Sequence, residues 1–167
     1  LENFSLVSGV RFDTHNRLGN FITPRVHIRY LPKENIILRA SVGNGRKASN
    51  IFSENQTLFG TNRIISITQN GGDIYGLNPE KAWNYGVSIR KIFSLWGGNG
   101  DITADYYVTD FTDQVVVDWE EKGRISFYNL IGKSRANSFQ LALDYSPFKA
   151  LNFRFAYKNY DVKTTYN

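Results

Sequence analysis

Arginine residues are the part of this sequence whose spacing most plainly suggests a binding chemistry. Arg25, His27 and Arg29 occupy every second position of one stretch, and Arg39 continues the pattern after a turn. Successive side chains of a β-strand point to opposite faces, so this spacing gathers the basic groups on one face. Such a face could attract anions; alternatively, it is a solvated face on which arginine stems cover apolar surface. Six arginines fit this polar face: Arg11, Arg25, Arg29, Arg39, Arg90 and Arg154.

Histidines and acidic residues give weaker signals. His15 and His27 fall on a loop and on a strand, without the spacing of metal ligands. The segment "IGKSR" imitates the end of a phosphate-binding loop, but Phe127 stands where that motif requires glycine. Five aspartates could suggest a cation site or a carboxylate pair, yet their spacing scatters them over both faces of a strand: Asp101, Asp105, Asp110, Asp113 and Asp118. The sequence therefore predicts no catalytic residue, no cofactor and no metal site, and a protein that is not an enzyme.

Composition excludes several classes of function. The chain has no cysteine, which rules out a disulfide framework, a thiolate metal site and a thiol nucleophile. Its net charge of +5 is too small to predict a nucleic-acid partner without a clustered basic patch. Aromatic residues make up 15% of the chain, which favours strands. No stretch approaches the roughly 18 apolar residues of a membrane helix, but barrel strands alternate and keep a low average hydropathy.

Alternation of apolar and polar residues predicts an all-β fold. In one segment Val26 and Ile28 alternate with Arg25 and His27, and comparable segments recur along the chain without a convincing helix. In the fifth segment the alternation slips, which predicts a bulge near Asp110. We expect an antiparallel up-and-down meander of about seven long strands, at about residues 3–13, 22–31, 36–46, 82–94, 102–119, 125–146 and 151–158.

The predicted connections alternate in length. "PKEN", "SLWGGNGD" and "PFKA" are short turns, whereas residues 14–21, 47–79 and 119–124 form loops at the opposite ends of the strands. Residues 47–79 read as a long loop, in which the short alternation at 65–67 suggests a small hairpin. The fifth strand would have about 18 residues and extend for about 60 Å, whereas a tilted strand crosses a bilayer with about 9 to 11 residues. Long strands with short turns at one rim are typical of outer-membrane barrels.

Several motifs, in order along the chain, resemble the β-barrel of TonB-dependent outer-membrane receptors. The first is a strand end, "GVRFD", followed by a loop glycine, a Pro-Arg pair, a proline turn and "LRAS"; the second is "GLNPEKAWNYG". The chain departs from the family's pattern at Asn44, Gly45 and Arg46, where an aromatic residue is usual. The residues that carry the resemblance are Gly9, Arg11, Phe12, Asp13, Gly19, Pro24, Arg25, Pro32, Leu38, Arg39, Ala40, Ser41, Leu77, Pro79, Glu80, Asn84 and Tyr85.

The resemblance implies that residues 1–167 are a single segment of a partial transmembrane β-barrel, from a receptor with about 22 strands whose N-terminal plug lies outside this chain. It implies a location in the Gram-negative outer membrane, with lipid on the apolar face and the six arginines facing the lumen. The expected function is active uptake of a large scarce nutrient of the ferric siderophore, haem or cobalamin class. The expected partners are outer-membrane lipid, the metal-chelate cargo and, through the plug, the TonB complex. Because its edges stay open and one face stays apolar, the isolated segment is expected to form an open or curled sheet that hides its apolar face by self-association.

Two alternatives remain open from the sequence. One is a soluble, lipocalin-like ligand-binding barrel, and the other is a structural β-sandwich. In either of these, apolar residues such as Val26, Leu38, Ile89, Leu141 and Phe153 would converge in a closed interior. Aromatic residues near the strand ends would be core residues in a sandwich and interfacial girdle residues in a transmembrane barrel: Phe12, Tyr30, Trp83, Tyr85, Tyr145 and Tyr157.

Overall fold

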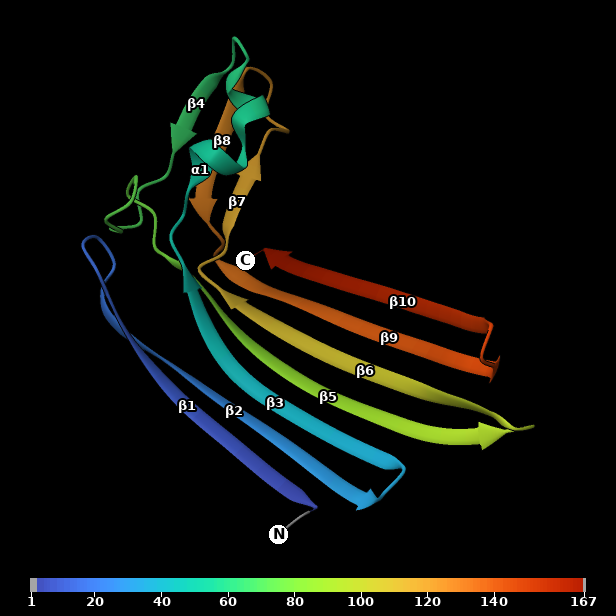
Figure 1. Cartoon of the computed structure of the whole chain (residues 1–167). Helices are drawn as coiled ribbons and strands as arrows, with labels where there is room; N and C mark the ends of the chain where they lie inside the picture. Colours follow the sequence, from blue (N-terminus) through green and yellow to red (C-terminus); the bar gives the residue numbers. More distant parts are fainter. Residues whose placement is uncertain (1–2, 167) are drawn as a thin grey trace.

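The computed structural model describes residues 3–166, and most of them lie in one long antiparallel sheet (Figure 1). Its seven strands follow the order β1-β2-β3-β5-β6-β9-β10, so each strand pairs with the next long strand along the chain. The predicted all-β, up-and-down meander is thereby confirmed. The strands are β1 (Phe4–His15), β2 (Gly19–Lys33), β3 (Ile36–Lys47), β5 (Glu80–Leu95), β6 (Gly98–Thr112), β9 (Gly132–Phe148) and β10 (Leu151–Tyr166).

A smaller unit stands at one end of the meander (Figure 1). It contains a three-stranded sheet in the order β4-β8-β7 and two very short helices. We call residues 48–79 and 113–131, which build it, the loop platform. Among the described residues, no helix is long and apolar enough to cross a membrane. The platform elements are α1 (Ile51–Glu54), the 3-10 helix η1 (Gln56–Phe59), β4 (Ile64–Ile67), β7 (Val115–Asp118) and β8 (Arg124–Asn129).

The predicted fifth and sixth strands are each divided in two, so those boundaries were wrong. Strand β6 ends at Thr112, and Asp113 adopts the left-handed conformation with a φ of 57°. Asp is one of the few residues that adopt this conformation readily. The turn at Asp113 separates β6, whose apolar residues occupy even positions, from β7, in which Val115 and Val117 occupy odd positions. The slip therefore marks a strand end rather than a bulge near Asp110. Strand β7 then joins the platform sheet. The predicted sixth strand is likewise divided, into β8 of the platform sheet and β9 of the meander.

The loop predicted at 47–79 contains more regular structure than its composition suggests. Strand β4 is not one arm of a hairpin, because it pairs in parallel with β8, Ile65 lying opposite Ile125. A small antiparallel turn does occur later in the loop, where Gly72 bridges Gly76 and Ile74 bridges Leu77. A parallel pairing across about sixty residues cannot be inferred from local alternation, which explains why the sequence did not predict it.

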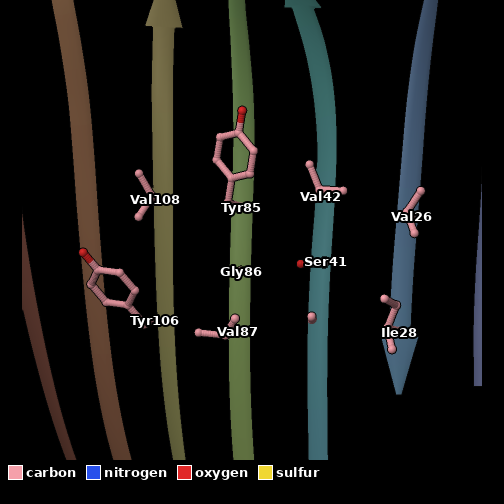
Figure 2. A pocket seen from close by; sticks show the side chains of 10 residues that line it. Val26, Ile28, Ser41, Val42, Tyr85, Gly86, Val87, Tyr106 and Val108 are labelled. Carbon is pink, nitrogen blue, oxygen red and sulfur yellow. The ribbon is translucent and has the colours of Figure 1, made fainter. Parts of the chain in front are cut away.

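The strand register places the apolar residues of the meander on one face. Val26 lies opposite Val42, Val42 opposite Tyr85, and Tyr85 opposite Val108. Directly opposed residues share a face of the sheet, so this row crosses four strands on the same side. Figure 2 shows the row, with Val26, Val42, Tyr85 and Val108 side by side on neighbouring strands.

This apolar face lies open. Ile89 keeps 46% and Phe153 keeps 56% of their surface exposed, and Val26, Leu38 and Leu141 are half-buried. These five residues do not converge in a closed interior, because no second sheet within residues 3–166 covers the meander. The lipocalin-like and β-sandwich alternatives both require such an interior and do not fit this fold.

Candidate functional site: the polar face and the loop platform

The register places all six predicted arginines on the face opposite the apolar row. Arg29 lies directly opposite Arg39, which in turn lies opposite Ser88, two residues before Arg90. Near the β10 edge of the sheet, on the same face, Arg154 lies opposite Asp144. The face that we call the polar face therefore carries Arg11, Arg25, Arg29, Arg39, Arg90 and Arg154.

Two of these arginines are neutralised by aspartates on neighbouring strands. The guanidinium of Arg90 donates two hydrogen bonds of 2.9 Å to the carboxylate of Asp101. Arg154 donates one of 2.6 Å to Asp144, which itself lies opposite Asp101. Bidentate and charge-assisted pairs of this kind are among the stronger polar contacts in proteins. The half of the polar face on β5, β6, β9 and β10 therefore brings its own counter-charges.

The half of the polar face on β2 and β3 has no such counter-charges. Arg25, Arg29 and Arg39 are exposed and form no ion pair with any carboxylate of residues 3–166. A shallow hollow runs beside Arg29 and Arg39, lined by these two arginines, the carboxylate of Asp105 and other polar side chains from five strands. The ring of Tyr107 packs directly over the backbone of Gly86, where an added Cβ would lie 2.4 Å from the ring. The hollow can accept an anionic group.

The apolar face ends at a charged pair that sequence analysis missed. Arg135 donates hydrogen bonds to Asp110, and both belong to the apolar side of their strands, one row beyond Val108. Aromatic side chains flank the apolar residues at both ends: Trp83 stacks on Tyr85 near the platform, with ring centroids 6.3 Å apart. At the short-turn end Phe93 stacks on Tyr145 at 6.1 Å. Trp83, Tyr85 and Tyr145 are among the aromatic residues expected near strand ends, whereas the Arg135–Asp110 pair depends on the cross-strand register, which the sequence does not contain.

The loop platform has a hydrophobic core to which both loops contribute. Ile51 and Leu77 come from the first loop, and Ile125 and Phe127 come from the second. All four side chains are fully buried, with exposures of 2% or less. Because neither loop carries enough apolar surface to enclose this core, the two loops have to fold together. The two loops therefore pack into a single unit.

A buried asparagine holds the two loops together at the base of the platform. The side chain of Asn129 accepts a hydrogen bond from the backbone N–H of Asn78 at 2.7 Å. Its Nδ2 donates to the carbonyl oxygens of Asn78, at 3.0 Å, and of Asp113, at 2.7 Å. Asn129 is 3% exposed, so each bond satisfies a group that water cannot reach.

Ion pairs surround this base. Lys47 is the last residue of β3. Its Nζ atom lies 2.7 Å from Oε2 of Glu54 in α1 and 3.5 Å from Oε2 of Glu80 at the start of β5. Its hydrogen bond to Glu54 raises the pKa of the Lys47 ammonium above its usual value. Lys81 pairs with Asp113 at 3.2 Å and links β5 to the second loop. These contacts connect the platform to the ends of the long strands.

The outer surface of the platform carries a cluster of aromatic rings that sequence analysis did not single out. Phe52 stacks on Phe59 with ring centroids 4.7 Å apart, and it meets Tyr75 edge-on at 5.0 Å. Phe52 and Tyr75 are exposed. Tyr75 has a φ of 56°, a conformation that costs a bulky residue on the order of 1 kcal/mol or more. Exposed rings of this kind can pack against an apolar or planar ligand.

The remaining candidate residues have local roles. His15 Nδ1 accepts hydrogen bonds from the backbone N–H groups of Arg17 and Leu18, which fixes the turn between β1 and β2. His27 lies on the polar face between Arg25 and Arg29. Within residues 3–166, no group of three or more His, Cys, Asp or Glu side chains is arranged to hold a metal ion.

Long antiparallel strands, an uncovered apolar face and a polar face with paired charges fit a segment of a transmembrane β-barrel. A family model described as "TonB dependent receptor-like, beta-barrel" matches residues 1–167. The chain belongs to this family, whose members are transport receptors of the Gram-negative outer membrane. No curated protein matches the sequence.

Solved structures of such receptors share the fold. The FrpB iron transporter from Neisseria meningitidis aligns over 97% of this chain with a TM-score of 0.68 and 17% identity. A mutant of the ferric enterobactin receptor PfeA from Pseudomonas aeruginosa, in complex with enterobactin, aligns over 92% with a TM-score of 0.64 and 16% identity. The aligned part is 24% of each of these proteins, so this chain spans about a quarter of their length.

Proposed function

We propose that this chain forms part of the barrel wall of an outer-membrane receptor that imports a large, scarce nutrient. The observation that carries the proposal is the two-faced register of the meander: apolar side chains on one face would meet lipid, and arginines on the other would line the lumen. A lumen lined with arginine attracts anionic groups. An anionic cargo could therefore cross the membrane through the lumen, whereas it could not cross the hydrocarbon of the bilayer.

The height of the apolar face supports a position in the membrane. On β6 the uncharged residues of this face run from Gly100 to Val108, and the next residue on the face is Asp110. About nine residues extend for about 30 Å at about 3.3 Å per residue. At the usual tilt of about 40°, this corresponds to about 23 Å across the bilayer, close to the apolar band of about 25 Å of outer-membrane barrels. The aromatic pairs Trp83–Tyr85 and Phe93–Tyr145 would then lie at the two interfaces.

Among large, scarce nutrients, a ferric siderophore fits best as the cargo, and haem and cobalamin are the alternatives. Support comes from the structural neighbours, which are an iron transporter and a ferric enterobactin receptor. Within the chain, the exposed rings of Phe52 and Tyr75 on the platform would contact cargo outside the cell, and the polar-face arginines would contact it inside the lumen. Energy would come from the TonB complex through a plug outside residues 1–167.

Uptake measurements on the complete receptor test this proposal. The gene that encodes this chain is deleted from its bacterium, and uptake of radiolabelled ferric siderophore, haem and cobalamin is compared with and without the gene restored on a plasmid. We expect one of the three to be imported only when the gene is present, and the receptor to fractionate with the outer membrane. Unchanged uptake of all three, or recovery of the protein in a soluble fraction, would contradict the proposal.

A further inference from the structure

The chain contains three Asn-Gly pairs, which the structure places in different surroundings. In such a pair the backbone nitrogen of glycine can attack the side-chain carboxamide of asparagine, because glycine has no Cβ to hinder the close approach. The attack needs a backbone that can turn towards the side chain and a glycine N–H that no hydrogen bond holds. The three pairs are Asn44–Gly45, Asn70–Gly71 and Asn99–Gly100.

Two of the pairs are held in the long sheet. Asn44–Gly45 lies within β3 and is paired with β5. Asn99–Gly100 lies within β6, between β5 and β9, where an added Cβ at Gly100 would lie 2.7 Å from the carbonyl oxygen of Asp144. Attack at either pair requires the strand to leave its hydrogen-bonded ladder first, which is a local unfolding step.

The third pair, Asn70–Gly71, lies outside any strand or helix, between β4 and the small antiparallel turn of the first loop. Both residues are exposed. Gly71 has a φ of 83°, and the space where a Cβ would lie is open. Its N–H donates no hydrogen bond to another backbone group of residues 3–166. The Gly71 nitrogen is therefore available to react without prior unfolding.

We propose that Asn70 is a deamidation site and that its modification loosens the loop platform. The Gly71 nitrogen bonds to Cγ of Asn70 and loses its proton, and the side-chain amide leaves as ammonia. Water then opens the resulting succinimide to aspartate or to isoaspartate, in which the backbone runs through the former side chain. Asparagine and water thus yield a carboxylate and ammonium, a covalent change that adds a negative charge. The proposal concerns the platform itself and does not depend on the proposed function.

The side chain of Asn70 contacts the asparagine that joins the two loops. Its Nδ2 donates to Oδ1 of Asn129 at 3.4 Å, and the same oxygen accepts the backbone N–H of Asn78. An ionised carboxylate only accepts hydrogen bonds. After deamidation two acceptors therefore face each other at this point, and the contact between the loops becomes unfavourable.

The turn that follows Asn70 leads into the platform core. It is closed by a hydrogen bond of 2.7 Å from the N–H of Asn70 to the carbonyl oxygen of Gly76. An added Cβ at Gly72 would overlap the carbonyl group of Leu77, so the backbone there is closely packed. Leu77 is a core residue with 1% of its surface exposed. Isoaspartate adds a methylene to this backbone and would displace the core side chain.

Ageing of the complete receptor tests the reactivity. The receptor is purified in detergent and incubated at mildly alkaline pH, and peptide mass spectrometry follows the conversion of each asparagine to acid. We expect Asn70 to convert at least about tenfold faster than Asn44 and Asn99, which have to open from their strands first. In urea the three sites should convert at similar rates, because each precedes glycine. Similar rates in the folded receptor, or slower conversion at Asn70, would overturn the proposal.

Amide hydrogen exchange tests the consequence. Asn70→Asp supplies the charge directly, whereas Asn70→Gln keeps an amide that would have to close a larger ring. We expect Asn70→Asp to speed exchange in β4 and β8 by about threefold or more and to leave the meander unchanged. Ageing should produce the same change in the unsubstituted receptor and not in the Asn70→Gln variant. Platform exchange that stays constant while Asn70 converts, or that drifts equally in the Asn70→Gln variant, would contradict the loosening.

Discussion

In the loop platform Phe127 and Leu77 have 0% and 1% of their surface exposed, whereas on the apolar face of the meander Phe155 and Val10 keep 61% and 73%. Both regions are rich in apolar side chains, but only the platform encloses them. The platform therefore gains its stability from water-excluding packing. The meander has a continuous hydrogen-bonded ladder and no interior of its own, so its apolar side chains need lipid or another surface to be removed from water. The comparison indicates that one short chain contains two regions suited to two solvents.

The largest expected effect is the loss of the platform core. Replacing Phe127 by Ala removes a ring on which both loops pack, and large-to-small changes of this type cost about 3–5 kcal/mol. We expect faster amide hydrogen exchange throughout β4, β7 and β8, and unchanged exchange in the meander. The control is Phe52→Ala, which removes an exposed ring of the same platform. Equal exchange in the two variants would show that the platform has no cooperative core.

Next in size is a charge on the apolar face of the meander. Val87 lies on the apolar face two residues after Tyr85 on β5, opposite Ala40 and Tyr106 (Figure 2). Val87→Arg should cost about 2–4 kcal/mol for insertion into lipid. The neighbouring Ser88→Arg puts the same charge on the polar face and should cost much less. Both costs are measured by folding each variant into lipid vesicles and determining the folded fraction from the heat-modifiable mobility of the barrel on a gel. If the two variants fold equally well, the assignment of faces is wrong.

A smaller effect is expected at the asparagine that joins the loops. Asn129→Ala leaves the N–H and C=O of Asn78 and the C=O of Asp113 without their partners, and an unsatisfied buried group costs about 1–3 kcal/mol. The platform should melt at a lower temperature while the meander does not change. Asn84→Ala removes one exposed hydrogen bond, to Thr109, and serves as the control. A platform whose melting temperature is the same in both variants would argue against a joining role.

The smallest effect concerns Lys47, which has more than half of its side chain exposed. Its pKa in the folded protein is raised above 10.5 by the Glu54 carboxylate. The stabilisation is therefore fully present below pH 10.5 and is lost as the pH rises through the raised value. Because the pair is exposed, Lys47→Met should cost less than about 1 kcal/mol. Thermal melts at pH 7 and pH 9 should show the same small difference, and a difference that disappears by pH 9 would contradict this origin.

Much of the meander could be predicted because each strand carries its own alternation. Arg25, Val26, His27 and Ile28 separate into two faces without reference to any other strand, and the short turns keep neighbouring strands adjacent. The loop platform could not be predicted in the same way. Its core depends on Phe127 meeting Leu77 across about fifty residues, and nothing local to either residue indicates the other.

The polar face could likewise be predicted only in part. The six arginines could be assigned to one face from spacing alone. Which of them are neutralised depends on register, because Arg90 meets Asp101 only when β5 and β6 pair as they do. The difference between the paired arginines and those of β2 and β3 therefore became visible only in three dimensions.

The central claim is that one face of the meander meets lipid while the other is hydrated, and spin labels test it most directly. Val87→Cys and Ser88→Cys are each labelled in the complete receptor, reconstituted in lipid, and relaxation by oxygen and by a water-soluble nickel chelate is measured. The account predicts that oxygen relaxes the label at position 87 more strongly than the nickel chelate does, and that this preference is absent at position 88. Equal accessibility of the two labels to oxygen and to the nickel chelate would contradict it.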